Sequence, residues 1–426
     1  MPATESANAD NALIRLLLTP EGRADPYALY RQIRDEAPVL RSSLGPIVLS
    51  RYEDCAHALR DPHLGRGTKL RLDGEAGAAG GLGMGGFGGM DTDPAARAEF
   101  FETAGNNMLF ADPPDHTRLR RLANRAFTPA RAEALRPAVA DMVDDLLDAM
   151  EDEGDVDVMP AMAYPLPVTV IGELVGVPAS DRDAFQPLVR AGTVALEPTA
   201  DAGALAEASK ATAQLREYFL DLLTARRRDP KDDLLSALAE SRDQGDALSD
   251  DEVVATAILL YAAGFETTTN LIGNGLLALL RHPEELDRWR RDPSLSRTGV
   301  DELLRWDSPV QVNMRMALEP AVVAGESLDV GGSVLVLQGG ANRDPERFTD
   351  AETLDVGRRD NQPLSFGGGI HHCLGAGLAR MEGEVVFSRM LQRFGSIDLL
   401  DDVPEWRPTL TLRGLSSLTV RVTASA

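Results

Sequence analysis

Cysteine is nearly absent from this chain. Its 426 residues contain two cysteines, Cys55 and Cys373, and neither a Cys-x-x-Cys nor a His-x-x-x-His spacing occurs. Structural zinc sites draw four ligands from such spaced pairs, so the sequence predicts no site of that kind. Two thiols without an evident partner suit a reducing compartment, and we therefore expect a cytoplasmic protein.

Positive charge and long apolar runs are also scarce. The chain has 43 Lys and Arg against 67 Asp and Glu, which gives a net charge of −24. This balance argues against nucleic acid or an anionic membrane as a partner. The apolar run at residues 12–18 is short and is interrupted by Arg15, so we expect neither a signal peptide nor a membrane anchor.

Linkers are missing as well. No Pro/Ser-rich stretch or block of like charge divides the 426 residues, although that length could form two or three average domains. A hydrophobic content of 43% supports a sizeable core. We expect a monomer with a single domain over residues 1–426, of which about residues 1–24 form an N-terminal extension.

Helical periodicity dominates what the sequence does contain. Strand-like segments are few and short, and Gly45-Pro46 breaks one of them into a hairpin. The expected fold class is therefore mainly α with minor β. The predicted helices cover residues 26–35, 52–60, 115–126, 129–151, 161–174, 204–228, 249–281, 283–290, 300–306 and 376–394. The predicted strands cover residues 39–50, 333–338, 410–412 and 417–422.

The most informative segment is the loop at residues 366–375, which places Cys373 among four glycines immediately before a predicted helix. Glycine allows a sharp turn and a close approach of the backbone to a flat cofactor. The positive N-terminal end of the helix favours the charged form of a nearby sulfur. The loop therefore predicts one cysteine presented to a metal as a thiolate.

Other interpretations of this thiol differ in what they require. An inert buried cysteine is the simplest interpretation of Cys55, which lies in a predicted helix, but it leaves the glycines around Cys373 unexplained. A nucleophilic cysteine needs a histidine from elsewhere in the chain, and this alternative stays open. A haem with a thiolate ligand needs only one cysteine, so we favour it. The histidines outside the loop are His57, His63, His116 and His282.

Six residues of the loop match the Phe-Gly-x-Gly-x-His-x-Cys-x-Gly signature of the cytochrome P-450 family, which the chain therefore resembles. The resemblance implies haem b (iron protoporphyrin IX) with its iron bound by Cys373. It also implies one large domain of this family with a long central helix over the haem. The matching residues are Phe366, Gly367, Gly369, His371, Cys373 and Gly375.

The glycine-rich stretch at residues 74–89 cannot pack as a helix or a strand. It is either a tolerated surface insertion or a lid over the substrate, because the resemblance places the active-site loop of the family in this region. By the same resemblance, we expect the walls of the substrate pocket to include residues 74–110, 185–196, 260–266, 310–313 and 413–415.

The longest predicted helix begins with a capping box of Ser249 and Glu252 and is apolar nearly all round, which indicates burial. Its middle contains Gly264, Glu266 and Thr267, and burying such polar groups costs free energy unless they are partnered. Taken alone, the segment indicates a kink with threonines bonded to carbonyls of the preceding turn. It is similar to the family motif on the distal haem face, which implies that Thr267 stabilises bound oxygen and Glu266 connects to the proton supply.

Glu302 and Arg305 lie three residues apart on one predicted helix, a spacing that usually gives a surface ion pair worth about 0.2–0.5 kcal/mol. The pair resembles the Glu-x-x-Arg of the family, which braces the cysteine loop together with an arginine upstream of it. Two arginines are candidates for that third position, and the spacing of the bacterial members favours Arg358 over Arg347.

Four further residues match positions that bind the haem propionates in the family. His116 and Arg120 are four apart on one face of a predicted helix, Arg315 lies in a later segment, and His371 belongs to the cysteine loop. Each alone could be an ordinary surface residue. A bidentate bond between arginine and carboxylate suits the role, and the resemblance implies that the four act together.

Residues 116–131 contain five arginines and no acid, although the chain as a whole is acidic. Such a stretch is often only a solvated helix face. By resemblance it lies beside the thiolate, where it could dock an acidic electron donor such as a ferredoxin. No flavin or nicotinamide domain is evident in the sequence, so we expect electrons to come from a separate protein.

Together these features indicate a haem-thiolate monooxygenase of secondary metabolism, which uses dioxygen to hydroxylate or epoxidise a small organic substrate. Desaturation or ring coupling on the same haem is an alternative that the sequence does not separate from hydroxylation. A non-catalytic haem-binding protein is another alternative, but the acid and alcohol pair speaks against it, because binding alone needs no proton relay. The identity of the substrate does not follow from the sequence.

Overall fold

The computed structural model describes residues 3–72, 107–243 and 245–425. Helices make up most of these residues and the strands are short, which confirms the predicted fold class of mainly α with minor β. The glycine-rich stretch at residues 74–89, predicted to be an insertion or a lid, lies outside the described residues.

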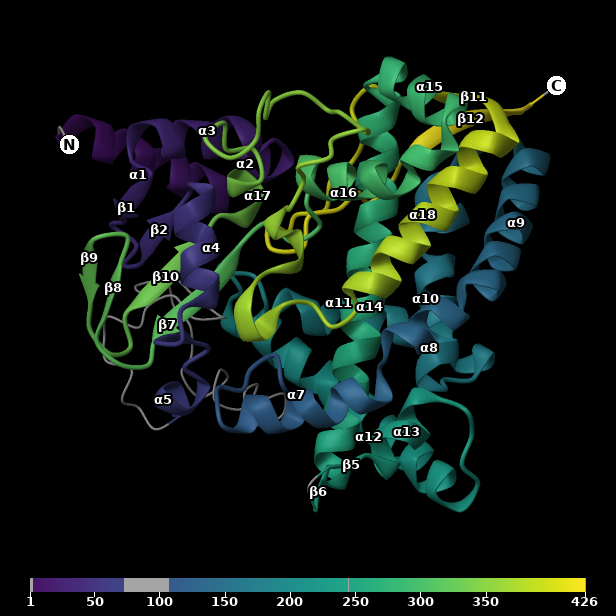
Figure 1. The fold of residues 1–426 in the computed structure, drawn as a ribbon, viewed down its shortest axis with the longest axis horizontal. Coiled ribbons are helices and arrows are strands. Elements are labelled where there is room, and N and C mark those ends of the chain that lie inside the picture. Colours follow the sequence, from purple (N-terminus) through teal and green to yellow (C-terminus); the bar gives the residue numbers. More distant parts are fainter. Residues whose placement is uncertain (1–2, 73–106, 244, 426) are drawn as a thin grey trace.

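Helices and strands follow one another along the chain as labelled in Figure 1. The helices are α1 (Ala3–Leu18), α2 (Pro20–Ala24), α3 (Tyr27–Glu36), α4 (Tyr52–Arg60), α5 (Thr68–Leu72), α7 (Asp115–Ala126), α8 (Pro129–Ala134), α9 (Arg136–Glu153), α10 (Pro165–Val175), α11 (Arg182–Val194), α12 (Ala202–Arg228), α13 (Leu234–Glu240), α14 (Asp250–Leu280), α15 (Pro283–Arg291), α16 (Ser296–Trp306), α17 (Gln338–Ala341) and α18 (Ala376–Arg393). The strands are β1 (Val39–Arg41), β2 (Ile47–Leu49), β3 (Leu64–Gly65), β4 (Asp155–Asp157), β5 (Arg242–Asp243), β6 (Asp246–Ala247), β7 (Asn313–Ala317), β8 (Ala321–Val323), β9 (Glu326–Leu328), β10 (Ser333–Val336), β11 (Phe394–Leu399) and β12 (Thr419–Ala424).

A mixed five-stranded sheet lies on the side of the molecule that holds the N-terminus (Figure 1). Its strand order is β1-β2-β10-β7-β3, in which β2 and β10 pair in parallel and the other neighbours are antiparallel. The predicted hairpin forms β1 and β2. Residues 410–412, predicted as a strand, make a single bridge between Leu412 and Val310.

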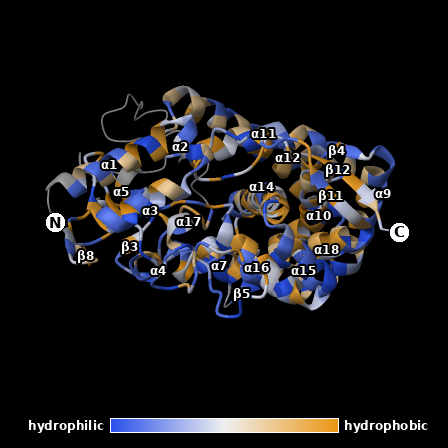
Figure 2. Ribbon diagram, turned by 90° about the horizontal axis from the view of Figure 1, so that it is seen from above, coloured by the Kyte–Doolittle hydropathy of each residue, from blue (hydrophilic) through white to orange (hydrophobic). Residues whose placement is uncertain are grey.

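The long helix α14 runs through the middle of the molecule and is seen nearly end-on in Figure 2, enclosed by other helices. It packs against α10, α12, α16 and α18. The predicted capping box starts it: Ser249 Oγ accepts a hydrogen bond from the N–H of Glu252 (3.2 Å), and Glu252 accepts one from the N–H of Ser249 (2.8 Å). Helix α14 is buried on nearly all sides because its surface is apolar nearly all round, and burial removes that surface from water.

Some helices differ from the prediction. The helix expected at residues 129–151 is divided into α8 and α9, because Pro137 in the first turn of α9 has no N–H with which to continue the preceding helix. The sequence did not predict α1, α11 or α13. In α1, Leu13, Leu16 and Leu17 are buried against α3, so residues 3–18 contribute to the core.

Candidate functional site

The loop before α18 holds Cys373 in a constrained backbone. The N–H of Cys373 donates to the carbonyl of Phe366 (2.9 Å). Gly367 and Gly369 have φ angles of 69° and 62°, a region that residues with a Cβ rarely adopt. A Cβ on Gly369 would also lie 2.6 Å from the carbonyl oxygen of Leu59 in α4. Glycine is therefore required there both by conformation and by packing.

The sulfur of Cys373 opens into a cavity of about 300 Å³ between α14, α7 and the loop. Burial raises the pKa of the Cys373 thiol, while the N–H of Gly375 and the charges of Arg120 and Arg380 act in the opposite direction. Desolvation thus opposes the thiolate that the sequence predicted, whereas the two arginines favour it. A metal ion deprotonates a coordinating thiol outright.

Two histidines face each other in the same cavity. His116 of α7 and His371 of the loop have ring centroids 4.4 Å apart. Both ring nitrogens of His116 and Nε2 of His371 are buried without a hydrogen-bond partner within the described residues. Burial is the main cause of the lowered pKa of each ring, so both are neutral and each retains an N–H to donate.

Two arginines, Arg66 and Arg120, line the cavity beside these histidines, and the buried Arg315 shares the hydrogen-bond partner Asn313 with Arg66. The sequence predicted Arg120 and Arg315 but missed Arg66, which precedes α5 and has no motif around it. Arg66 and Arg315 form no ion pair within the described residues, and both donate to Oδ1 of Asn313. Burial lowers the pKa of Arg66 to about 10 and that of Arg315 well below its usual value. Buried cations of this kind need an anionic partner.

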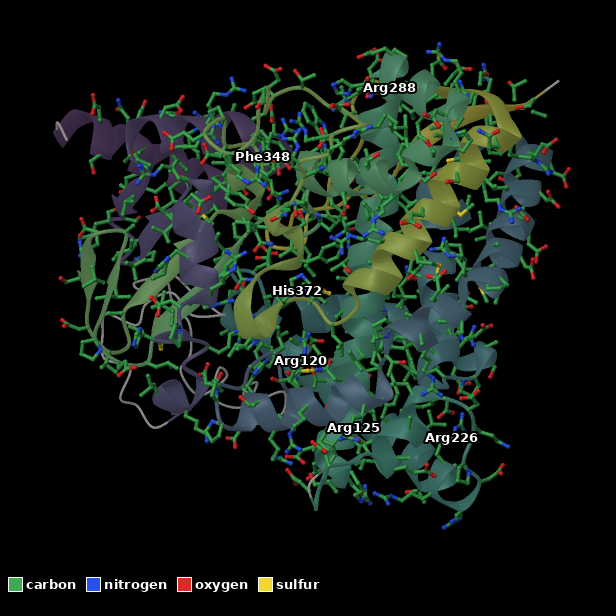
Figure 3. The ribbon with its side chains drawn as sticks, in the orientation of Figure 1. Arg120, Arg125, Arg226, Arg288, Phe348 and His372 are labelled. Carbon is green, nitrogen blue, oxygen red and sulfur yellow. The ribbon has the colours of Figure 1, made fainter. Side chains whose placement is uncertain are left out.

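Arg120 connects this cluster to the cysteine loop. Its Nη2 donates to the carbonyl of His372 (2.8 Å), and Figure 3 shows Arg120 on α7 close to His372. The cavity thus has a sulfur at one wall and unpartnered donors and cations at its rim. This donor set fits a haem, whose iron takes the sulfur and whose two propionates take the N–H groups.

On α14, Thr267 lines this cavity, and the adjacent Glu266 lines a second, larger cavity. Thr267 Oγ1 donates to the carbonyl of Ala263 (2.8 Å), which is the back-bonded geometry that the sequence allowed. Glu266 is buried and forms an ion pair with Arg407, which also bonds to Asn270. Arg407 lies far along the chain in an irregular segment, so no local pattern could have indicated it.

Thr267 lies where the smaller cavity meets a second one of about 540 Å³, which extends between α11, α12 and α14. The expected wall at residues 185–196 contributes Leu188 and Leu196 to this larger cavity. Residues 413–415 were also expected to form a wall, but none of them lines either cavity in the described part of the chain. Arg413 instead pairs with Asp307 (2.9 Å). The neighbouring Leu412 lines both cavities.

Gln311 and Asn313, which the sequence left as either substrate contacts or internal bonds, both make internal bonds. Gln311 Nε2 donates to the hydroxyl of Tyr27 (3.0 Å) and the carbonyl of Ser308 (2.7 Å). Asn313 Oδ1 accepts from Arg66 (3.2 Å). Asn313 therefore positions the cationic rim of the smaller cavity.

A second buried network joins α16 to the segment that precedes the cysteine loop. Glu302 and Arg305 of α16 are fully buried and joined by two hydrogen bonds (2.7 and 2.8 Å). Arg358 donates to Glu302 (3.1 Å), whereas Arg347 pairs with Asp360 (2.9 Å). Arg305 also donates to three carbonyls of residues 342–353. The network fixes the segment that leads into the loop.

Glu382 of α18 is a buried acid that the sequence did not indicate. It lines the smaller cavity, and its Oε2 has no partner within the described residues. Burial raises the pKa of Glu382 to about 8. The side chain is therefore protonated at neutral pH.

The basic stretch at residues 116–131 has acids close to it, as the interpretation of a solvated helix face with nearby counter-ions predicted. Arg118 pairs with Glu252, and Arg121 and Arg125 both pair with Asp243, on the β5–β6 side of the molecule. The acids come from a segment more than a hundred residues away, so the local sequence could not reveal them. Arg125, labelled in Figure 3, lies farther from the cysteine loop than Arg120.

Within the described part of the chain, no three His, Cys, Asp or Glu side chains form a group that could hold a metal ion. Nor does any helix in that part have the length and apolar character needed to cross a membrane.

The Cytochrome P-450 family model matches residues 194–292 and 295–417. The chain is 37% identical to the polyketide biosynthesis cytochrome P-450 PksS of Bacillus subtilis (strain 168), covering 95% of this chain and 98% of the relative. It is 38% identical to the 6-deoxyerythronolide B hydroxylase of Saccharopolyspora erythraea, covering 93% and 96%. A crystal structure of P-450 BioI in complex with an acyl carrier protein ligated to hexadec-9Z-enoic acid superposes with a TM-score of 0.85 at 34% identity, covering 95% and 99%.

Proposed function

Because the chain belongs to the cytochrome P-450 family, we propose that it is a haem b monooxygenase that oxidises a largely apolar secondary metabolite. Family membership makes it an oxidoreductase that uses an organic substrate, dioxygen and a redox partner. The observation that carries the proposal is Cys373, whose sulfur opens into a cavity rimmed by cations and histidines without anionic partners in the described residues.

In this proposal Cys373 binds the iron and four residues bind the propionates: His116, Arg120, Arg315 and His371. The neutral histidines donate N–H groups, and the arginines supply charge. Arg66 lies beside Arg315 and contributes to the same rim. When bound, the haem would activate dioxygen. The thiolate of Cys373 would donate electron density to its iron.

Glu266 and Thr267 handle protons on the distal side. Glu266 Oε1 is held by Arg407, while its Oε2 has no partner within the described residues and can accept a proton. Thr267 lies at the junction of the two cavities. The Thr267 hydroxyl, which donates to the carbonyl of Ala263 in this structure, would have to turn toward the haem side to donate a proton there, and Glu266 would supply protons to it. The brace of Glu302, Arg305 and Arg358 acts only by holding the loop.

We also propose an oligomeric state, a cellular location and an electron donor for the protein. The chain acts as a monomer and a single domain over residues 1–426 in the cytoplasm, with residues 1–24 as an extension. A ferredoxin-type donor docks on the face of the cysteine loop, where Arg60 and His372 are exposed. Secondary metabolism is supported by relatives named for polyketide biosynthesis and 6-deoxyerythronolide B hydroxylation.

Turnover with isotope-labelled dioxygen tests the function. With a surrogate ferredoxin system, one labelled oxygen atom is expected in the product of an apolar substrate. The Thr267→Ala variant is expected to keep its haem but to release most electrons as hydrogen peroxide, because the ordered hydroxyl is lost. Unlabelled product, or full coupling in the variant, contradicts the proposal.

A further inference from the structure

The two cavities meet at a junction whose walls differ in how they are held. Six side chains line both cavities: Leu109, Leu196, Leu259, Ala263, Thr267 and Leu412. Three of them belong to α14. Leu196 lies in the α11–α12 linker (residues 195–201), and Leu412 lies in the C-terminal turn (residues 409–413), both outside the helices and strands. The width of the junction therefore depends on the contacts that fix the linker and the turn.

A single carboxylate joins the α11–α12 linker to the C-terminal turn. Glu197 Oε2 accepts a hydrogen bond from the N–H of Leu410 (2.9 Å), and its Oε1 accepts one from the N–H of Thr411 (2.9 Å). In return, Thr411 Oγ1 donates to the carbonyl of Leu196 (3.1 Å). Leu196 directly precedes Glu197, and Leu412 directly follows Thr411. The three bonds therefore fix each wall residue through its neighbour in the chain.

The C-terminal turn is also anchored independently of Glu197. Arg413 pairs with Asp307 (2.9 Å) and donates to the carbonyls of Arg23 and Ala24 (2.6 and 3.0 Å). Within the described residues, the α11–α12 linker makes no hydrogen bond beyond α11 and α12 except those to the turn. Glu197 therefore holds the linker against a turn that is already fixed.

The link between the two segments is made by a buried charge. Glu197 is 6% exposed and forms no ion pair within the part of the chain that the structure describes. Burying a carboxylate without a cation costs free energy, which here the backbone N–H groups offset. A carboxylate makes stronger hydrogen bonds than a neutral group, and a glutamine offers one acceptor oxygen in place of two. A change at this one residue therefore weakens the link selectively.

Resting on the proposed function, we propose that Glu197 is a positioning residue that sets the width of the junction by holding the walls formed by Leu196 and Leu412 together. Glu197 lines neither cavity and acts only through these neighbours. A ligand confined to the smaller cavity does not depend on the two walls, whereas a ligand that extends through the junction is enclosed by them. Glu197 therefore determines how firmly the enzyme holds substrates that occupy both cavities.

Release of N-alkylimidazoles from the haem-loaded protein tests the inference, because the free ring nitrogen of these compounds binds haem iron and shifts its absorption spectrum. N-methylimidazole fits within the smaller cavity, and the tail of N-octylimidazole extends through the junction. In Glu197→Gln one charge-assisted hydrogen bond is lost. The population with separated walls, and with it the release rate of the octyl compound, is expected to rise about 10- to 100-fold. The release rate of the methyl compound is expected to stay unchanged.

Hydrogen exchange measures the link without any ligand. The amide hydrogens of Leu410 and Thr411 are expected to exchange about 10- to 100-fold faster in Glu197→Gln than in the wild type. Asp157→Asn is the matched control, since Asp157 also accepts two backbone N–H groups (3.0 and 2.9 Å), from residues that line neither cavity. This variant is expected to leave the release of both imidazoles unchanged.

Three outcomes overturn the inference: unchanged release of the octyl compound in Glu197→Gln, equal acceleration for both imidazoles, and the same length dependence in Asp157→Asn. If Glu197→Gln does not fold, Thr411→Val decides, because it keeps the carboxylate and removes only the hydroxyl that bonds to Leu196. It is expected to speed release of the octyl compound alone about two- to tenfold, and no acceleration overturns the inference. Failure of the proposed function looks different: the wild-type protein then shows no spectral shift with either imidazole.

Discussion

At the scale of single residues, the ion pair of Glu266 and Arg407 links the distal helix to the C-terminal segment. The two side chains are 2% and 14% exposed. Removing one partner of such a pair leaves an uncompensated buried charge, which costs about 3–5 kcal/mol. We expect Glu266→Gln and Arg407→Gln each to lower the thermal unfolding midpoint of the haem-loaded protein. The double variant is expected to recover most of that loss, because neither charge remains.

Product formation in the same variants separates the two roles of Glu266. Coupling of reductant to product should stay low in Glu266→Gln and in the double variant, since the acid is missing in both. Strictly additive losses of stability in the double variant would show that the pair is not coupled.

Glu382 is expected to make the free energy of unfolding depend on pH, and the sign of this dependence follows from the burial of its side chain. Its pKa is about 8 in the folded chain, against an ordinary value of 4.5. Between these values only the folded state binds the proton, so this residue makes stability fall by about 1.4 kcal/mol per pH unit as the pH rises. Its contribution is complete below pH about 4.5 and is lost by about pH 8. In Glu382→Gln this fall is expected to vanish, which thermal unfolding of both proteins across that interval measures.

At the scale of elements, Glu302 joins α16 to the segment that leads into the cysteine loop. Besides Arg305 and Arg358, it accepts hydrogen bonds from the N–H of Asp355 (2.9 Å) and from Asn361 (3.1 Å). We expect Glu302→Gln to destabilise the protein by about 3–5 kcal/mol, because two buried arginines lose their counter-charge, and to release haem faster. Haem transfer to apomyoglobin and the unfolding midpoint measure the two effects.

A nearby exposed ion pair provides the control for the brace. Asp360, which pairs with Arg347, is 82% exposed, and Asp360→Asn is expected to change both quantities little. Comparable effects in the two variants would mean that the brace has no special role in holding the loop.

The elements also show what the sequence can and cannot predict. The capping box of Ser249 and the loop around Cys373 were predicted because their residues are adjacent in the chain and act on the local backbone. The ion pair of Arg407 was missed because it joins residues 141 positions apart. Which acids pair with the α7 arginines could not be predicted for the same reason: the fold brings together groups that no local pattern connects. The period of α11 is obscured by Pro187 within it.

At the scale of the whole molecule, a net charge of −24 repels an acidic electron donor. Docking must therefore rely on a local cationic area, and the paired arginines of α7 do not provide one. Arg60 is exposed at the end of α4, against Gly368 and Gly369 of the cysteine loop. We expect Arg60→Glu to slow reduction by a ferredoxin about tenfold at low salt, with a smaller difference at high salt because the charges are screened.

The control for docking is Arg125→Glu, since Arg125 pairs with Asp243 away from the loop. Stopped-flow reduction of the haem measures both variants. Equal rates for Arg60→Glu and the wild type would place the docking surface elsewhere.

The central claim, that Cys373 binds a haem iron through its sulfur, is tested most directly by the carbon monoxide difference spectrum of the reduced protein. The wild-type chain is expected to show the red-shifted band of thiolate-ligated ferrous haem. In Cys373→Ala this band is expected to be absent, even where haem is still retained by the rim of His116, Arg120 and Arg315. A wild-type protein without the band, or an alanine variant that keeps it, would contradict the account.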